Sequence, residues 1–351
     1  MIHFLPATGN YMKKLRILTL MHDYLVPPSE LKGIDLVSAD WKTEYDVTSS
    51  LEYMGHEVIN LGLHNDLRSI REAIDKYKPH IAFNMMEAFD EISSFEMNIV
   101  SYLELLGMPY TGCNPRGMVL SRDKALTKIL LAHANIPTPT FEVIPRGNRV
   151  KLRKRRDFPL IVKSLTQEAS IGIAQASVVH NEIKLHDRIN FVHDAIGTDA
   201  IVEQFIEGRE LYVGVIGNDR LHAFPIWEMH FNKMPSELHH IATDRVKWNA
   251  GYQRRHGIMT NEATNLPKGM ANKLQNIAKR VYRALKMNGY ARMDIRLNAA
   301  GNCYVLEANA NPQLAYGEDF AESAECAGIS YEQLLQKILN VGLRWKPKQF
   351  G

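Results

Sequence analysis

Apolar runs and helical periodicities alternate along the first third of the chain. Residues 15–22 (LRILTLMH) and 81–86 (IAFNMM) are continuous apolar runs, which are typical of buried strands. Apolar residues recur at helical spacing over 67–78 and 94–106, and the second of these segments ends at Gly107. Strands that alternate with helices in this way predict an α/β layer on a parallel sheet.

The pattern changes after residue 121. A helical pattern over 122–135 stops before IPTPT, because two prolines prevent its continuation. One further helix near 181–196 lies among short strand patterns, which predicts a small α+β domain with strands at 141–144, 159–165, 173–179 and 200–206. After Gly208 we expect a larger α+β domain, with strands at 210–217, 220–229, 290–298 and 303–310 and helices at 269–286 and 330–343. The predicted domains are 14–121, 122–208 and 209–346.

The most informative stretch is YARMDIRLNAAGNCYVLEANANP at 290–312, two alternating runs joined by a turn. It reads as a β-hairpin. If the turn centres between Ala300 and Gly301, Asp294 lies opposite Glu307 and Arg292 lies opposite Asn309. Side chains alternate between faces with period two, so these polar groups share one face. The other face is then apolar and consists of Met293, Ile295, Leu297, Leu306 and Ala308.

This polar face predicts a site for a cation and a phosphoryl group. Asp294, Glu307 and Asn309 offer hard oxygen ligands, which suit Mg²⁺ held jointly with nucleotide phosphates. Arg292 beside them can clamp a phosphoryl group. A solvated sheet face with a cross-strand charge pair is the alternative interpretation of the same residues.

Two further strand ends carry candidate nucleotide contacts. Lys163 ends the apolar strand PLIVKSL, and a loop with Ala169, Ser170 and Gly172 follows it. A lysine charge and backbone N–H groups in such a loop can reach phosphate oxygens, although this feature taken alone favours a strand-end lysine that extends into water.

The second strand end carries carboxylates. Glu203 and Glu210 flank Gly208 in IVEQFIEGRE. They could accept hydrogen bonds from an adenine amino group and from ribose hydroxyls, and a charged turn is the competing interpretation.

Charge and composition exclude several classes of protein. Lys+Arg number 42 against Asp+Glu 39 in 351 residues, a net charge of +3, which argues against a dedicated polyanion binder. The basic run KLRKRRD at 151–157 has no aromatic residues interleaved, so a solvated loop is favoured over nucleic acid binding. No apolar run reaches membrane-span length, and the first residues lack a signal-peptide pattern, so we expect a cytoplasmic protein. Three cysteines without CxxC spacing predict neither a disulfide framework nor a zinc site.

The order DKALTK, VKSLTQEASIG, VEQFIEGRE, VKW, ARMDIRL and LEANANP resembles that of ATP-grasp ligases, most of all the D-alanine D-alanine ligase-like branch. The resemblance covers about Leu15 to Trp345 and includes LELLGMPYTG. It implies an ATP-grasp fold of three domains, α/β and α+β, with the nucleotide bound between the central and C-terminal domains. It also implies Mg²⁺, or Mn²⁺ in its place, as two ions, with ATP as cosubstrate.

Position by position, the resemblance assigns roles to the same hairpin face and to several lysines. Arg292 matches the arginine that stabilises the transferred phosphate, and Lys247 in VKW matches the lid lysine over the γ-phosphate. The remaining matches are phosphate contacts by Lys124 and Lys163, adenine contacts by Glu203 and the backbone of Ile206, the ribose contact by Glu210, and the magnesium ligands Asp294, Glu307 and Asn309.

Departures from the family pattern concern the substrate. Glu44 matches the glutamate of a Glu, Ser, Tyr trio that holds the first amino acid, but the serine position is Ala169 and the tyrosine position is Trp248. Glu87 is the charged group nearest to a missing His-Gly pair, and Gln313 replaces a glycine beside the second substrate. A polar pocket with changed partners usually rejects the original ligand, so we expect a product other than D-alanyl-D-alanine. Trp248 and Met85 suit a bulkier or more apolar carboxylate.

The predicted function is an ATP-dependent ligase that joins a small carboxylate to an amine through an acyl phosphate. A phosphotransferase without ligation, and an ATP-binding regulatory protein without turnover, are the alternatives. A dinucleotide dehydrogenase is disfavoured, since no GxGxxG follows the first strand. Neither nucleic acid nor membrane is expected as a partner, and the resemblance is compatible with a homodimer.

Overall fold

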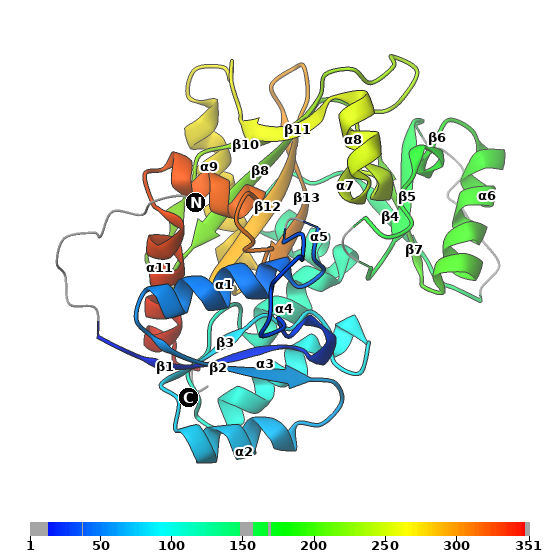
Figure 1. The fold of residues 1–351 in the computed structure, drawn as a ribbon. Coiled ribbons are helices and arrows are strands. Elements are labelled where there is room, and N and C mark those ends of the chain that lie inside the picture. Colours follow the sequence, from blue (N-terminus) through cyan, green and yellow to red (C-terminus); the bar gives the residue numbers. More distant parts are fainter. Residues whose placement is uncertain (1–12, 37, 148–156, 168–169, 348–351) are drawn as a thin grey trace.

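The computed structural model describes residues 13–36, 38–147, 157–167 and 170–347, which form three sheets (Figure 1). No helix within these residues combines the length and the apolar character needed to cross a membrane. Each sheet lies within one of the three predicted domains, whose boundaries stay a prediction. Predicted Ala169 and most of the basic run at 151–157 lie outside the described residues.

The N-terminal sheet is parallel, as predicted, with strand order β2-β1-β3. Its strands are β1 (Arg16–His22), β2 (Glu57–Leu63) and β3 (Ile81–Asn84). Its helices are α1 (Lys42–Tyr53), α2 (Arg68–Tyr77), α3 (Glu96–Leu105) and α4 (Pro115–Arg122), with 3-10 turns at Asp23–Leu25 and Ser93–Phe95. The sequence predicted β1, β3, α2 and α3 but missed α1 and β2, and α1 carries a candidate site residue, Glu44.

The C-terminal helix α11 (Tyr331–Arg344) packs against this N-terminal sheet, on the left of Figure 1. Leu334, Leu335 and Ile338 of the helix share one buried cluster with Ile81 and Phe83 of β3. Gly342 permits the close approach, because a Cβ there would lie 2.3 Å from the carbonyl oxygen of Tyr110. Helix α11 and the N-terminal sheet therefore stabilise one another.

The central sheet is small and antiparallel, with strand order β4-β7-β5-β6. Its strands are β4 (Phe141–Ile144), β5 (Leu160–Ser164), β6 (Val178–Val179) and β7 (Ala200–Gln204), with helices α5 (Lys124–His133) and α6 (Glu182–Phe191), a 3-10 turn at Gln175–Ser177 and a π-helical turn at Val192–Ile196. The predicted strand at 173–179 was wrong over most of its length. The hydroxyl of Ser177 accepts a hydrogen bond from the N–H of Ala174, which favours the turn over an extended strand.

The C-terminal sheet is antiparallel with order β11-β10-β8-β12-β13, and β9 pairs with the end of β8. Its strands are β8 (Arg209–Ile216), β9 (His222–Ala223), β10 (Trp227–Phe231), β11 (Ile258–Glu262), β12 (Tyr290–Leu297) and β13 (Cys303–Ala310). Its other helices are α7 (Asp244–Trp248), α8 (Ala250–His256), α9 (Met270–Ala284) and α10 (Asp319–Cys326). The predicted single strand at 220–229 was wrong, because Pro225 separates β9 from β10.

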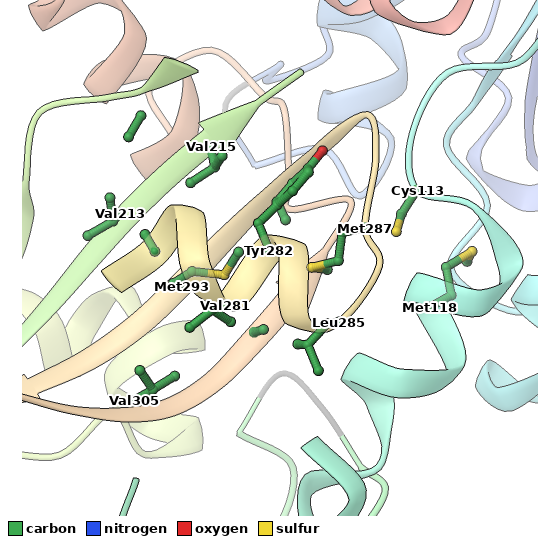
Figure 2. Packing of buried hydrophobic residues seen from close by; sticks show 14 of the residues in the cluster. Cys113, Met118, Val213, Val215, Val281, Tyr282, Leu285, Met287, Met293 and Val305 are labelled. Carbon is green, nitrogen blue, oxygen red and sulfur yellow. The ribbon is translucent and has the colours of Figure 1, made fainter. Parts of the chain in front are cut away.

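Helix α9 covers one face of this sheet. Val281 and Tyr282 of the helix pack with Val213 of β8, Met293 of β12 and Val305 of β13 (Figure 2). Side chains alternate along each strand, so the residues on either side of Met293 point to the opposite face. The fold thereby leaves the other face of β12 and β13 for polar groups.

Candidate functional site

The predicted hairpin register is confirmed where it matters for the site. Asp294 pairs with Glu307, and Arg292 pairs with Asn309, across β12 and β13. The register then shifts between Asp294 and Ile295, so Ile295 pairs with Val305. This β-bulge leaves Leu306 without a partner on β12 and places it in the lining of a pocket. The prediction that Leu306 lies on the apolar face was therefore wrong.

The two cross-strand pairs lie in two adjacent pockets. Asp294 and Glu307 line a cavity of about 50 Å³ between the central and C-terminal sheets. Arg292 and Asn309 line a neighbouring cavity of about 520 Å³, bordered by α1 and the end of β3. Lys247, from the short helix α7, lines both cavities. The polar face of the hairpin therefore spans the boundary between them.

Two carboxylates that face each other need positive charge to remain ionised. Burial would raise the pKa of Glu307, but the charges of Lys124, Lys247, Lys163 and Arg292 outweigh it and lower that pKa to about 2. At Asp294 the effect of burial exceeds that of the Arg292 charge, so the pKa of this carboxyl rises to about 6. The lysines predicted from separate motifs thus act on the same carboxylate.

Arg292 holds Asp294 with its guanidinium fork. Its Nε lies 2.8 Å from Oδ1 and its Nη2 lies 3.0 Å from Oδ2. The guanidinium carbon lies 4.7 Å from the centre of the Tyr212 ring, and Nη1 lies 3.9 Å from Asp319. These contacts fix the plane of the guanidinium, so its orientation in the lining of the larger cavity is set before a ligand binds.

Glu203, which lines the smaller pocket, lies between two buried lysines. Lys163 Nζ is 3.1 Å from Oε2, and Lys128 Nζ is 3.3 Å from Oε1. Burial would raise the pKa of Glu203, but the charges of Lys128 and Lys163 outweigh it and lower the pKa. Lys128 also donates to the carbonyl of Leu306, at 2.9 Å, and is completely buried. Sequence reasoning missed Lys128, although its position one helical turn after Lys124 in DKALTK was a usable signal.

Glu210 is also held by a residue that sequence reasoning missed. Arg296 Nη2 lies 2.6 Å from its Oε2, and the Tyr212 hydroxyl lies 3.1 Å from its Oε1. Arg296 shares the strand face of Arg292 and Asp294, and this parity was the available signal. Ile206 lines the same pocket, together with Ile161.

A segment spanning residues 239–248, which we call the lid, closes over the smaller pocket. Ser170 donates from its hydroxyl to the carbonyl of Ala242 at 2.7 Å, so this predicted phosphate residue binds the lid. The side chain of Gln175 is bonded to both the N–H and the carbonyl of His239, at 2.8 and 2.9 Å. Lys124, at the start of α5, donates to the carbonyl of Gln167 at 2.5 Å.

The larger cavity contains the predicted substrate residues that the structure describes. Glu44, Glu87, Trp248 and Gln313 all line it. Trp248 is exposed, and Gln313 donates to the hydroxyl of Thr43 at 3.1 Å. Glu44 is buried, and its Oε2 atom has no hydrogen-bond partner among the described residues. Burial, with a smaller contribution from the charge of Glu87, raises the pKa of Glu44 to about 7.

We expect Glu44→Gln to stabilise the protein at pH 8 by roughly 3 kcal/mol and to change stability little near pH 4.5. Between those values the folded protein keeps a proton that the unfolded chain releases, so the wild type loses stability as the pH rises to about 7. Urea unfolding at pH 5 and pH 8 measures the difference. Glu52→Gln, an exposed change on the same helix, is the control, and an equal pH dependence in both variants would contradict the interpretation.

The residues at the hairpin fit a hard divalent cation. Asp294, Glu307 and Asn309 supply oxygen donors, and the buried Nδ2 of Asn309 has no hydrogen-bond partner among the described residues. The described chain brings together no group of three His, Cys, Asp or Glu side chains suited to a metal ion. An ion here would therefore depend on the amide oxygen and on oxygens of a bound ligand.

Comparison with known proteins agrees with this architecture. The family model described as D-ala D-ala ligase C-terminus matches residues 130–340. A D-alanine–D-alanine ligase of Desulfotalea psychrophila is 30% identical over 248 residues, which are 70% of this chain and 73% of the relative. An uncharacterised protein of Sinorhizobium fredii is 28% identical over 85% of this chain and 86% of its own. The crystal structure of the Bacillus anthracis D-alanine–D-alanine ligase with ATP superposes with a TM-score of 0.70 at 22% identity, covering 94% of this chain and 98% of that one.

Proposed function

We propose, from the premise that the chain belongs to the D-alanine–D-alanine ligase family, that it joins two amino acids or amino-acid-like substrates through an acyl phosphate. As a member of this family it is an ATP-dependent ligase that forms carbon–nitrogen bonds. One observation supports the proposed route most directly. The Asp294–Glu307 pair lines the smaller pocket, and the adjacent Arg292–Asn309 pair lines the larger cavity. A phosphoryl group can pass from one pocket to the other across this face.

In the first step, a carboxylate oxygen of the donor substrate attacks the γ-phosphorus of ATP, and ADP leaves. The protein positions the two reactants and stabilises charge on the phosphoryl oxygens. Lys247 and Arg292 are the cations that line the larger cavity beside the hairpin, and we assign them this role. Asp294, Glu307 and Asn309 would hold Mg²⁺, which neutralises phosphate charge when bound.

In the second step, the amine nitrogen of the acceptor attacks the acyl carbon and the bond to phosphate breaks. The reacting amine must first lose the proton of its ammonium form, and a second proton leaves the nitrogen as the amide forms; both pass to solvent. Arg292 faces the oxyanion that develops at the acyl carbon, and its fixed plane favours this role. The lid excludes water, which would otherwise hydrolyse the acyl phosphate.

ATP binding requires the lid to move. The smaller pocket measures about 50 Å³, whereas small-molecule pockets occupy about 300–1,000 Å³. The bonds from Ser170 and Gln175 to the lid hold the pocket in this closed form. We therefore assign the adenine base of ATP to the slot between Ile161, Ile206 and Leu306. We assign the opening of this slot to displacement of the lid.

The donor carboxylate is proposed to be bulkier or more apolar than D-alanine. Trp248, Met229, Ile258 and Met85 contribute apolar side chains to the lining of the larger cavity. Burying a larger apolar side chain there would add about 0.8 kcal/mol per CH₂ group to binding. Formation of a homodimer stays a prediction.

The test is ADP release from purified protein with Mg·ATP, across D- and L-amino acids singly and in pairs, with mass spectrometry of the products. We expect ADP release to require both a donor and an amine and to yield a dehydrated adduct. Asp294→Asn should abolish this release. ADP release with a phosphorylated product and no need for an amine would contradict ligation, and D-alanine as the best substrate would contradict the proposed donor.

A further inference from the structure

Strand β13 is the last strand of the C-terminal sheet, so backbone groups on its outer edge need partners from outside the sheet. The segment between α5 and β4 supplies them. The N–H of Val305 donates to the carbonyl of Pro137 at 2.9 Å, and the hydroxyl of Thr138 donates to the carbonyl of Val305 at 3.0 Å. Lys128 Nζ donates to the carbonyl of Leu306, the bulge residue, at 2.9 Å. The bulge that shapes the smaller pocket is therefore held from behind by Lys128.

The same ammonium also contacts the opposite wall of the smaller pocket. Lys128 Nζ lies 3.3 Å from Oε1 of Glu203, on β7 of the central sheet, and it donates to the hydroxyl of Thr138 at 3.2 Å. An ammonium has three N–H groups, which matches these two oxygens and the carbonyl of Leu306. In the described part of the chain, Lys128 lines neither cavity of the site. It therefore connects the two walls without facing a ligand itself.

Neutralising Glu203 does not account for Lys128 by itself. Lys163 Nζ lies 3.1 Å from Oε2 of Glu203 and already supplies one positive charge to this carboxylate. A second, completely buried ammonium is costly, because it is removed from water and lies close to the first. What distinguishes Lys128 from Lys163 is its hydrogen bond to the carbonyl of Leu306, on the other sheet. This contact points to a role in the geometry of the pocket.

We propose that Lys128 is a positioning residue for the base of ATP, which fixes Leu306 on one wall of the slot relative to Glu203 on the other. This inference rests on the proposed function, which assigns the base to the slot between Ile161, Ile206 and Leu306. Without the ammonium, the carbonyl of Leu306 loses its donor and the two walls lose their shared contact. The slot then has to be ordered by the base when it binds, and this ordering reduces affinity.

The phosphates of ATP depend on other elements. Lys247 and Arg292, the cations assigned to the transferred phosphoryl group, lie on α7 and β12. A loss of Lys128 should therefore weaken the binding of the nucleoside part of ATP and affect the binding of a bare triphosphate much less. This difference separates positioning of the base from a general loss of structure.

Calorimetric titration with Mg·ATP and with Mg·tripolyphosphate tests the inference on the full-length protein. The ratio of the two dissociation constants reports the contribution of the nucleoside. We expect Lys128→Met to weaken Mg·ATP binding by about tenfold and Mg·tripolyphosphate binding by less than about twofold. Leu131→Ala is the matched control, because Leu131 lies on the same helix, is completely buried and lines neither cavity. It should lower stability in urea unfolding and keep the ratio of the wild type.

Thr138→Val provides a second variant, since it removes the hydroxyl that joins Lys128 to the carbonyl of Val305. It should give the same selective loss at a smaller magnitude, and it decides the question if Lys128→Met does not fold. An unchanged ratio, or equal weakening of both ligands, would overturn the inference and leave the ligase function standing. If the wild type bound Mg·ATP no more tightly than Mg·tripolyphosphate, the assignment of the base to this slot would itself fail.

Discussion

Replacing Arg292 by lysine is expected to lower kcat by about 10²–10³-fold, with a much smaller change in KM for ATP. The guanidinium makes a two-point contact with Asp294 and lies over the ring of Tyr212, so its plane is fixed before any substrate binds. A lysine ammonium keeps the charge but has neither the fork nor the stacking surface. The loss should therefore appear mainly in the chemical steps.

Arg209→Lys is the matched control for this prediction. Arg209 lies on the adjacent strand β8 and donates hydrogen bonds to Glu228 through the same two nitrogens, Nε and Nη2. It lines neither cavity of the proposed site. Steady-state kinetics and urea unfolding on both variants separate catalysis from stability. An unchanged kcat in Arg292→Lys would remove Arg292 from the proposed mechanism, and equal losses in the two variants would indicate a structural cause.

The strand periodicity predicted the central feature of the site correctly. The register of Asp294 with Glu307 follows from alternation alone, because a one-residue slip would place Met293 and Ile295 on the polar face. Periodicity could not predict the bulge at Leu306, since an extra residue in one strand leaves the pattern on either side intact. The bulge turns the side chain of Leu306 toward the smaller pocket, which it lines.

The residues that sequence reasoning missed depend on contacts between elements that are distant in the chain. Lys128 looks like a surface lysine in DKALTK, and its burial follows from the central sheet and β13 packing over α5. Arg296 likewise becomes a partner of Glu210 only because β12 pairs with β8. Helix α1 was missed because its polar residues conceal a weak apolar stripe, although Val47 and Leu51 are completely buried. Motif order identified the charged groups of the site, but it could not show which of them neutralise one another.

The cluster of Glu203 with Lys128 and Lys163 is expected to give the largest effect on stability. Glu203→Gln should destabilise the protein by about 3–5 kcal/mol, because it leaves two buried lysines without their shared carboxylate. Lys128→Met alone should cost less, since Lys163 still pairs with Glu203. Adding Lys128→Met to Glu203→Gln should restore part of the lost stability, so the two changes are not additive.

The pH dependence of Glu203→Gln provides a second test of the same cluster. Without the carboxylate, burial and mutual repulsion lower the pKa of both lysines, so the folded protein binds fewer protons than the unfolded chain. Its stability should then rise with pH, and its deficit relative to the wild type should shrink between pH 7 and pH 9. Urea unfolding across this range measures the trend, with the exposed change Glu207→Gln as control. Additive losses in the double variant, together with a deficit that does not depend on pH, would show that Glu203 contributes through packing rather than through its charge.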